Sequence, residues 1–506
     1  MKYLILLLSL IFAQPVFADT YTIDGVFYAQ TAAGIEAAIS DATAGDSIYM
    51  PAATYLLTDD IDNTKSGLTF YGDGPSTVLS LVDNVNLTVV RTTVSNTTYR
   101  DFNISGNKAN QSAGSGLGFT NGCNNTLIQN ITIDNTFWYG ISFSMSNNET
   151  IKNCTITNAG RDTLDPETYG MGIYLNDVDD ITIDGNTISD SFSSGIDVNG
   201  GCFNVIVSNN DISGVQSDHR SGIHAWNWLS GTLEDNYIHD FIETANGING
   251  IFLRGADGTD TKMAIDVDIK RNRIENVTGV GIEFQSGGSA SNYLNVSGNI
   301  MTGSAVGSQN PAVYFARGYI NFTNNIIPNW HEEGLEFVNL TLVNNINVYH
   351  NTILNIGQRY RGYAFYFPGD NATDINIKDN IVADTQAVRT MTNIIYHGGS
   401  TLSNITLDYN CYYPEFAGFI KYDGVDFDTL AAYQLATSQD AHSIASDPLL
   451  SSRYRLKPGS PAINAGASLG VADDYLGNWR DLRPDIGAME AGDFIHEATL
   501  HDAKLN

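Results

Sequence analysis

A short stretch in the middle of the chain concentrates residues that can perform acid–base chemistry. Residues 217–228 read SDHRSGIHAWNW, with two histidines, an aspartate, an arginine and two tryptophans. Histidine titrates near neutral pH, and an arginine guanidinium can hold a carboxylate through two parallel hydrogen bonds. Such a set could remove a proton beside a carboxylate that the arginine neutralises. Asn, Thr, Gly, Ile and Val recur throughout the rest of the chain, so the repeats must position this set.

One phrase of alternating apolar and polar residues recurs along the chain, for example as ITIDGNTI, VIVSNNDI, INFTNNII and INIKDNIV. Aligning these phrases places nine asparagines in one column: Asn186, Asn210, Asn236, Asn272, Asn299, Asn325, Asn351, Asn380 and Asn410. Short alternating strands joined by Gly/Asn turns predict an all-β fold. The fold class that we predict is a right-handed parallel β-helix, a single-stranded solenoid whose coils share one core. A β-propeller would need four strands per blade and a longer, regular period.

The column of asparagines has two expected consequences. Stacked amides can hydrogen-bond along the axis of the solenoid, and Asn tolerates the left-handed backbone conformation that tight turns require. We therefore expect a ladder of asparagine side chains at left-handed positions.

A second column follows the first, in the phrases GISFS, GIYLN, GIDVN, GIHAW, GIFLR, GIEFQ, AVYFA and AFYFP. Its apolar positions should point inward, so the alternate positions should point outward on one sheet. The first outward line is Ser142, Tyr174, Asp197, His224, Phe252, Glu283, Tyr314 and Tyr366. The second is Ser144, Asn176, Asn199, Trp226, Arg254, Gln285 and Ala316. We expect Asp197, His224, Arg254 and Glu283 to face solvent on one sheet.

This stripe suits a sugar-binding groove, since aromatic rings and planar polar side chains match sugar rings edged with hydroxyls. The simpler alternative is that polar and aromatic residues merely decorate an exposed sheet. Inserted loops carrying Arg161, Asp162, Asp218, His219 and Arg220 enter the same column and would wall the groove.

Uronate chemistry is the first hypothesis for the stripe, as in a polysaccharide lyase. It needs neutralisation of the substrate carboxylate, a base and a proton donor. We expect an arginine, a histidine and Tyr174 in these roles. The catalytic candidates are His224, Arg254, Asp197, Tyr174, His219 and Arg220. The substrate-binding candidates are Trp226, Glu283, Asn199, Asn176, Tyr314 and Arg161.

Two alternatives stay open. A glycoside hydrolase needs two carboxyl groups about 5–5.5 Å or about 6.5–9.5 Å apart. Asp197 and Glu283 lie three coils apart, about 14 Å, so Asp218 or Asp162 would have to approach Asp197. The stripe could also belong to a non-catalytic glycan-binding or surface protein.

Composition limits the partners. Acidic residues outnumber basic ones by 56 to 25 and the formal net charge is -31, which argues against nucleic acid or an anionic membrane and favours a neutral glycan. Residues 1–18 resemble a signal peptide and no later segment is apolar enough to span a bilayer, so we expect a secreted or periplasmic monomer without a transmembrane anchor. The four cysteines are expected to be free, because Cys123 and Cys202 lie about three coils apart.

The remaining chain divides into four predicted parts. Residues 19–98 hold an amphipathic helical cap and the first coils, and 99–415 hold the β-helix with the Asn column. Residues 416–492 form the C-terminal cap region, and 493–506 a tail.

The N-terminal stretch, the Asn column and the C-terminal motif DPLLSSRYRLKPGSPAINAGA…DLRPDIGAMEAG (447–492) resemble secreted β-helix proteins of the pectate-lyase-like superfamily. The resemblance covers nearly the whole chain after residue 18. It implies the fold and a polysaccharide ligand, because the superfamily includes lyases, hydrolases and uronate epimerases. Residues 217–220 lack the proline of the epimerases' Asp-Pro-His motif. The resemblance to pectate lyases also implies a possible Ca²⁺ site, for which Asp197, Asp218 and Asp162 are the candidate ligands.

Overall fold

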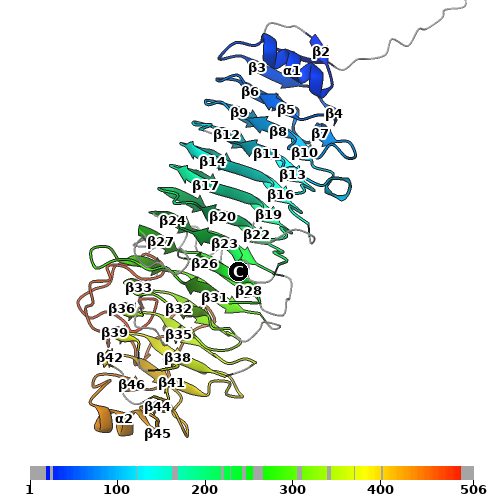
Figure 1. Cartoon of the computed structure of the whole chain (residues 1–506). Coiled ribbons are helices and arrows are strands. Elements are labelled where there is room, and N and C mark those ends of the chain that lie inside the picture. Colours follow the sequence, from blue (N-terminus) through cyan, green and yellow to red (C-terminus); the bar gives the residue numbers. More distant parts are fainter. Residues whose placement is uncertain are drawn as a thin grey trace, which may run out of the picture.

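The computed structural model describes residues 19–22, 27–120, 122–161, 169–217, 221–227, 230–241, 247–254, 266–304, 310–338, 343–359, 361–369, 371–399 and 403–491. The described chain forms an elongated solenoid of three β-sheets, with helix α1 (Ala32–Asp41) at one end and helix α2 (Leu430–Thr437) at the other (Figure 1). Two 3₁₀ turns, η1 (Gly74–Ser76) and η2 (Lys108–Asn110), interrupt the loops. Within these residues, no helix is long and apolar enough to cross a membrane.

The strands of the described chain fall into three sheets. Sheet A contains β1 (Asp19–Thr22), β2 (Phe27–Ala29), β3 (Ser47–Met50), β6 (Thr69–Gly72), β9 (Thr98–Arg100), β12 (Leu127–Gln129), β15 (Thr150–Lys152), β18 (Thr182–Asp184), β21 (Val205–Ser208), β24 (Ser230–Glu234), β27 (Asp266–Lys270), β30 (Leu294–Ser297), β33 (Ile320–Thr323), β36 (Asn344–Tyr349), β39 (Thr373–Lys378) and β42 (Ser403–Asp408). Sheet B contains β4 (Ala53–Leu57), β7 (Thr77–Leu81), β10 (Asn103–Ser105), β13 (Thr132–Asp134), β16 (Thr155–Thr157), β19 (Thr187–Ser189), β22 (Asp211–Ser213), β25 (Tyr237–His239), β28 (Arg273–Val277), β31 (Ile300–Gly303), β34 (Ile326–Pro328), β37 (Thr352–Leu354), β40 (Ile381–Ala383), β43 (Cys411–Tyr413) and β46 (Ile444–Ala445). Sheet C contains β5 (Ile61–Asn63), β8 (Val90–Thr92), β11 (Leu117–Phe119), β14 (Ile141–Asn147), β17 (Ile173–Asp179), β20 (Ile196–Asn199), β23 (Ser221–Trp226), β26 (Asn249–Arg254), β29 (Ile282–Phe284), β32 (Val313–Phe315), β35 (Leu335–Phe337), β38 (Tyr363–Phe367), β41 (Asn393–His397), β44 (Ile420–Tyr422) and β45 (Val425–Phe427).

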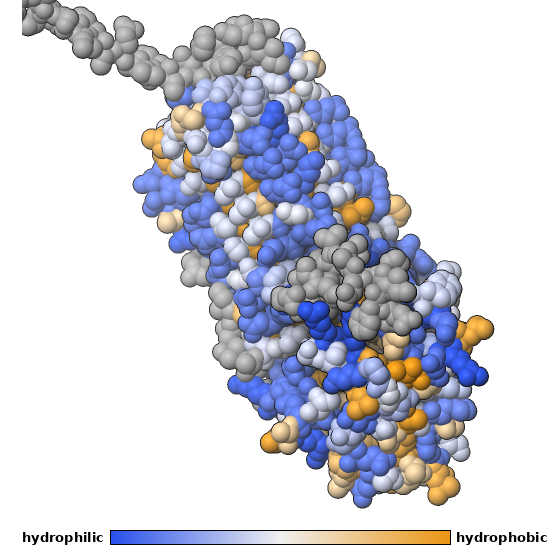
Figure 2. Space-filling model, turned by 180° about the vertical axis from the view of Figure 1, so that it is seen from behind, coloured by the Kyte–Doolittle hydropathy of each residue, from blue (hydrophilic) through white to orange (hydrophobic). Residues whose placement is uncertain are grey.

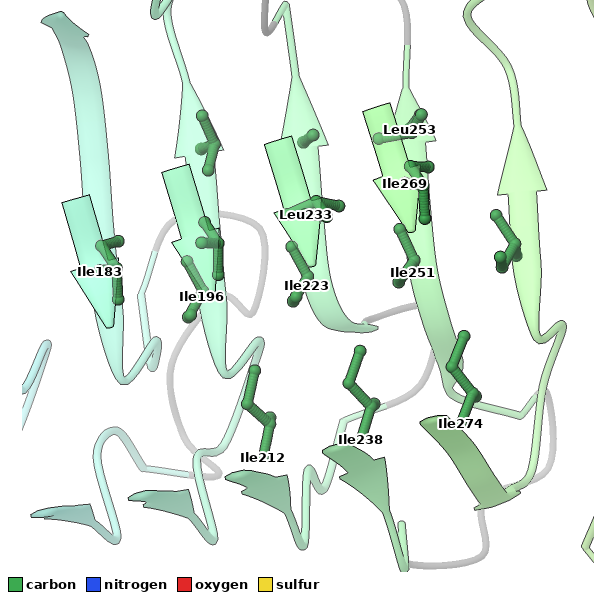
Figure 3. Packing of buried hydrophobic residues seen from close by; sticks show 14 of the residues in the cluster. Ile183, Ile196, Ile212, Ile223, Leu233, Ile238, Ile251, Leu253, Ile269 and Ile274 are labelled. Atoms are coloured by element: carbon green, nitrogen blue, oxygen red, sulfur yellow. The ribbon is translucent and has the colours of Figure 1, made fainter. Parts of the chain in front are cut away.

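From β3 to β44 the chain visits sheet A, sheet B and sheet C in turn, so each coil stacks in parallel on the one before it. Short strands with one apolar centre make this possible, because the central side chain points into the solenoid and its neighbours point out. Ile212, Ile238 and Ile274 pair directly across adjacent strands of sheet B. Figure 3 shows them in one row, directed into the space between the sheets. The stacked rows form one continuous core, which confirms the predicted parallel β-helix.

The asparagine column forms a buried ladder, as predicted. Each amide Nδ2 donates to the Oδ1 of the next member at 2.9–3.1 Å, from Asn186 through to Asn410. The Nδ2 groups also donate to backbone carbonyls. Each Oδ1 accepts the backbone N–H of the residue at the same position one coil earlier, which is Cys154 for Asn186 and the preceding asparagine for the later members. Every amide of the ladder's interior is therefore hydrogen-bonded without water.

The expected backbone conformation of the ladder was wrong by one residue. The left-handed residue is the one before each ladder asparagine, such as Asn209, Asp235 and Arg271, with φ of 54°, 56° and 56°. The ladder asparagines themselves do not have a positive φ, and their N–H groups donate to the next amide along the axis, as Asn210 does to Asn236. One residue thus forms the left-handed turn, and the next residue contributes its amide to the ladder.

The four cysteines, Cys123, Cys154, Cys202 and Cys411, are free and buried, as predicted. Burial raises the pKa of Cys154, Cys202 and Cys411 to about 12, so these thiols are unreactive as nucleophiles at neutral pH.

The C-terminal strap, which we define as residues 447–491, packs along the outer face of sheet B. Leu456, Ala462 and Ile486 of the strap lie against Leu354 and Ile381 of the sheet. Sheet B is consequently buried on both faces there, which explains why every residue of β34, β37 and β40 is buried. The face seen in Figure 2 is mostly hydrophilic, and hydrophobic residues are more frequent toward the end that carries α2.

A buried carboxyl group predicts how stability depends on pH. Burial raises the pKa of Glu149 to about 8, and its Oε2 accepts the Thr126 backbone N–H at 2.6 Å. A raised carboxyl pKa stabilises the fold fully below the unfolded value of about 4.3, and this contribution is lost as the pH rises through about 8. Thermal unfolding should therefore occur at a lower temperature at about pH 9 than at about pH 5.

Glu149→Gln keeps the acceptor for Thr126 but cannot ionise, so it should flatten this dependence by on the order of 2–4 kcal/mol. Differential scanning calorimetry at the two pH values measures the difference. Parallel curves for the variant and the parent would contradict the assignment.

Candidate functional site

The pairing of sheet C confirms the predicted register of the outward stripe. Successive strands place the first line in one row: Ser142, Tyr174, Asp197, His224, Phe252, Glu283 and Tyr314. The second line is in register for Ser144, Asn176, Asn199, Trp226 and Arg254. Gln285 and Ala316 follow the ends of β29 and β32, and Ala316 is buried, so the expected extension of the second line to an outward Ala316 was wrong.

The sequence interpretation missed one member of the row. Glu336 on β35 pairs with Tyr314 on one side and Tyr366 on the other, so Tyr366 is not the direct neighbour of Tyr314. The signal was present, because GLEF at 334–337 has the same form as GIEF at 281–284. Tyr396 of β41 continues the row beyond Tyr366.

Asp197 and His224 lie on neighbouring strands, and their side chains are hydrogen-bonded. Nδ1 of His224 lies 2.9 Å from Oδ2 of Asp197. Both side chains are only 2% exposed, so the expectation that they face solvent was wrong. Tyr174 and Phe252 flank the pair in the row, and the longer aromatic side chains shield it; the Phe252 ring lies 5.4 Å from the imidazole.

One polar atom of each partner is buried without a hydrogen bond. Among the described residues, neither Oδ1 of Asp197 nor Nε2 of His224 has a partner. In the neutral imidazole, the Asp197 carboxylate accepts the Nδ1 hydrogen, so Nε2 carries the lone pair. The pair thus orients an imidazole whose Nε2 is buried without a hydrogen-bond partner among the described residues.

Glu283, which is half-buried, is held by two amides. Its Oε2 accepts from Asn249 Nδ2 and its Oε1 from Gln285 Nε2, each at 2.7 Å. Burial raises the pKa of Glu283 above its ordinary value, while the two amides and the charges of His224 and Arg254 act in the opposite direction. Both oxygens are therefore solvated by protein donors in the ionised form.

Glu336 has a different environment. Burial and then the charge of Glu332 raise its pKa to about 7, and the charge of Arg361 acts in the opposite direction. Burial, followed by the charge of Glu332, also raises the pKa of Glu333 to about 8. Within the described residues, no side-chain amide donates to Glu336 as Asn249 and Gln285 do to Glu283, so the Glu336 carboxyl keeps its proton up to near neutral pH.

Glu283 and Glu336 are separated by one intervening strand, whose outward residue is Tyr314. Two strand spacings correspond to about 9.5 Å between their backbones. Burial, then the charges of Glu336 and Glu283, raises the pKa of Tyr314, so both carboxyls act on that ring. The arrangement is a pair of carboxyl groups with unlike environments on one sheet face, which is the pattern of an acid and a base.

The other predicted site residues are dispersed. The Arg254 guanidinium lies 4.4 Å from the centre of the Trp226 ring. Arg161 instead packs on Phe137, at 5.5 Å, and donates to the Lys108 carbonyl, so these contacts lie away from the row on sheet C. The catalytic candidates His219 and Arg220 lie outside the described residues.

The structure describes only one of the three candidate calcium ligands. Asp218 and Asp162 lie outside the described residues, and the Oδ2 of Asp197 is bonded to His224. In the described part of the chain, no group of three or more His, Cys, Asp or Glu is placed to hold a metal ion.

A family model described as "Right handed beta helix region" matches residues 61–238 and 166–327, which together span more than half of the chain. No curated protein matches.

Several solved structures are similar. A tailspike double mutant of E. coli bacteriophage HK620 in complex with a pentasaccharide has a TM-score of 0.51 at 14% identity, over 75% of this chain and 71% of that one. The A-module of the Azotobacter vinelandii mannuronan C-5 epimerase AlgE6 has a TM-score of 0.46 at 15% identity, over 76% and 95%. At such identities the likeness shows the fold alone.

Proposed function

Because the chain belongs to the right-handed β-helix family, whose stacked coils present a rigid sheet face, we propose that sheet C binds a polysaccharide and that the protein hydrolyses its glycosidic bonds. The observation that carries this proposal is the pair Glu283 and Glu336, two strands apart with Tyr314 between them. Their backbones are about 9.5 Å apart, at the upper end of the separation of about 6.5–9.5 Å between carboxyl groups in inverting glycosidases.

The unlike environments of the two carboxyls assign their roles. Glu336, whose pKa is raised to about 7, donates its proton to the glycosidic oxygen as the bond to the anomeric carbon breaks. Glu283, held by the amides of Asn249 and Gln285, accepts in its ionised form a proton from the water that attacks the anomeric carbon from the opposite face. The product then has the inverted anomeric configuration, and the separation of the carboxyls leaves room for that water.

The substrate of this site is an uncharged glycan. The protein as a whole is strongly acidic, with a formal net charge of -31. A polyuronate would be repelled by this charge, whereas burial keeps the carboxyls of Glu333 and Glu336 largely protonated near neutral pH. Neutral sugars would instead meet the half-exposed ring of Tyr314 and the amides around Glu283.

The test is an activity screen of the purified protein on neutral polysaccharides and on pectate and alginate. We expect new reducing ends from a neutral polymer, with inversion at the anomeric carbon in the first product detected by proton NMR. Retention of configuration, or activity confined to the uronate polymers, would contradict the assignment of Glu283 and Glu336.

The activity should show a bell-shaped dependence on pH. The descending limb should lie near pH 7, where Glu336 loses the proton that it must donate. The ascending limb reports Glu283, which must be ionised and whose pKa is raised above its ordinary value. Initial rates measured across pH would show both limbs, and a rate that keeps rising above about pH 8 would exclude Glu336 as the acid.

A second candidate, uronate chemistry by elimination or epimerisation, is favoured by the Asp197–His224 pair. An oriented imidazole whose Nε2 has no hydrogen-bond partner among the described residues suits a base that removes a proton beside a carboxylate. Arg254 and Tyr174 would neutralise the carboxylate and donate the proton. In the same screen, an unsaturated product that absorbs ultraviolet light, lost in His224→Gln, would favour elimination over hydrolysis.

We also propose that the protein is exported, on the basis of the basic residue and short apolar run within residues 1–18. A polymer substrate is met outside the cytoplasm. N-terminal sequencing of the native protein should find Asp19 first, and an intact Met1 would contradict export by this route.

A further inference from the structure

Four aromatic side chains gather at the N-terminal end of the row on sheet C. Tyr174 stacks on Tyr139 with ring centres 4.8 Å apart, and Trp138 stacks on Tyr169 at 5.3 Å. Tyr139 and Tyr169 lie 6.0 Å apart and join the two stacks. All four residues are half-buried. We call this group the upper aromatic cluster.

The upper aromatic cluster lies on the same row of sheet C as Glu283 and Glu336. Tyr174 belongs to the same outward row as Glu283, with Asp197, His224 and Phe252 between them. Four strand spacings separate Tyr174 from Glu283, or about 19 Å. One sugar ring is too short to span this distance. A polymer that follows the row along the sheet could contact both sites.

A second aromatic group lies on the other side of the catalytic pair. Tyr366 and Tyr396 follow Glu336 in the row, and Tyr363 stacks on Tyr396 at 4.4 Å. Tyr363 and Tyr366 lie 5.2 Å apart. The row therefore runs from aromatic rings, through the carboxyl pair, to aromatic rings, over eight strand spacings or about 38 Å.

We propose that the upper aromatic cluster is a remote glycan-binding subsite, which makes the protein act within long chains of uncharged sugar rather than on short oligosaccharides. Aromatic faces bury the apolar face of a sugar ring without requiring a charge on it. The cluster is farther from Glu283 than Tyr366 is from Glu336. More of the sugar chain is therefore bound between the cleavage site and the N-terminal end of the solenoid. The endo-acting mode rests on the proposed hydrolysis, whereas glycan binding at the cluster does not.

The experiment measures binding separately from turnover. The parent is Glu336→Gln, which cannot act as the acid, and the probes are dextran, laminarin, xylan, galactomannan and starch in affinity gel electrophoresis. Oligosaccharides of increasing length, prepared from the polymer that retards the parent most, are then titrated by calorimetry. Trp138→Ala in this parent should weaken binding of chains that reach the cluster about tenfold or more, with unchanged binding of the shortest ones.

Controls separate the subsite from general damage. Trp138→Phe keeps an aromatic face and should stay within about threefold of the parent. Trp479→Ala removes a tryptophan that is 77% exposed on the C-terminal strap and should change nothing. Thermal unfolding shows which variants fold, and Tyr139→Ala replaces Trp138→Ala if the latter does not.

The two proposals can fail independently. Retardation by none of the five polymers, or equal losses of affinity for short and long chains, would overturn the remote subsite. Length-dependent binding that Trp138→Ala abolishes, in a wild-type protein that releases no reducing ends, would retain the subsite and reject the hydrolase.

Discussion

Glu336→Gln should lower kcat on the polysaccharide substrate by two to four orders of magnitude, because the glycosidic oxygen loses its proton donor. The carboxyl is kept protonated near neutral pH by burial and by the charge of Glu332, so the amide replaces a group that is already uncharged. The fold should consequently be unaffected. The loss should be far smaller on an aryl glycoside with an acidic phenol as leaving group, since that departure needs no protonation.

Glu283→Gln should behave differently. It removes the base that activates water, so the loss should be equally large for the polymer and for the aryl glycoside. Glu275→Gln, on sheet B and paired with Arg273 at 2.7 Å, is the matched control and should retain activity. Initial rates on both substrates decide the matter, and a Glu336→Gln variant that retains full activity on the polymer would remove Glu336 from the mechanism.

Asn236→Ala, a change in the interior of the ladder, should produce a large loss of stability. The Asn236 side chain donates to Asn272 Oδ1 and the Val207 carbonyl, and its Oδ1 accepts from the backbone and side chain of Asn210. Alanine would leave several of these buried groups without partners, at roughly 1–3 kcal/mol each. We expect a loss of about 3–6 kcal/mol, seen as a lower midpoint of urea unfolding followed by circular dichroism.

The protein contains its own control for this prediction. Asn321 belongs to a second amide ladder on the outer face of sheet A, where it donates to Asn295 at 3.0 Å and accepts from Asn347 at 2.9 Å. Water can replace these partners, so Asn321→Ala should cost less than about 1 kcal/mol. Equal shifts of the urea midpoint for the two variants would show that burial does not set the strength of the ladder.

The repeated phrases alone determined the fold and the register of sheet C. A side-chain period of two assigns each residue a face, and the apolar centre of each phrase selects which face is buried. For this reason Asp197, His224 and Glu283 could be placed in one row without coordinates. The sequence also contains the information that places Glu336 in this row, because GLEF has the same form as GIEF.

Burial and charge at the candidate site were decided only by the tertiary structure. Asp197 and His224 are outward by register but buried, because exposure depends on side chains from neighbouring coils that lie far away in the sequence. The raised pKa of Glu336 likewise depends on the burial of its carboxyl and on the position of Glu332. Period-two alternation gives the direction of a side chain but not the height of its neighbours. The pairing of an acid with a base therefore emerges only when the coils are stacked.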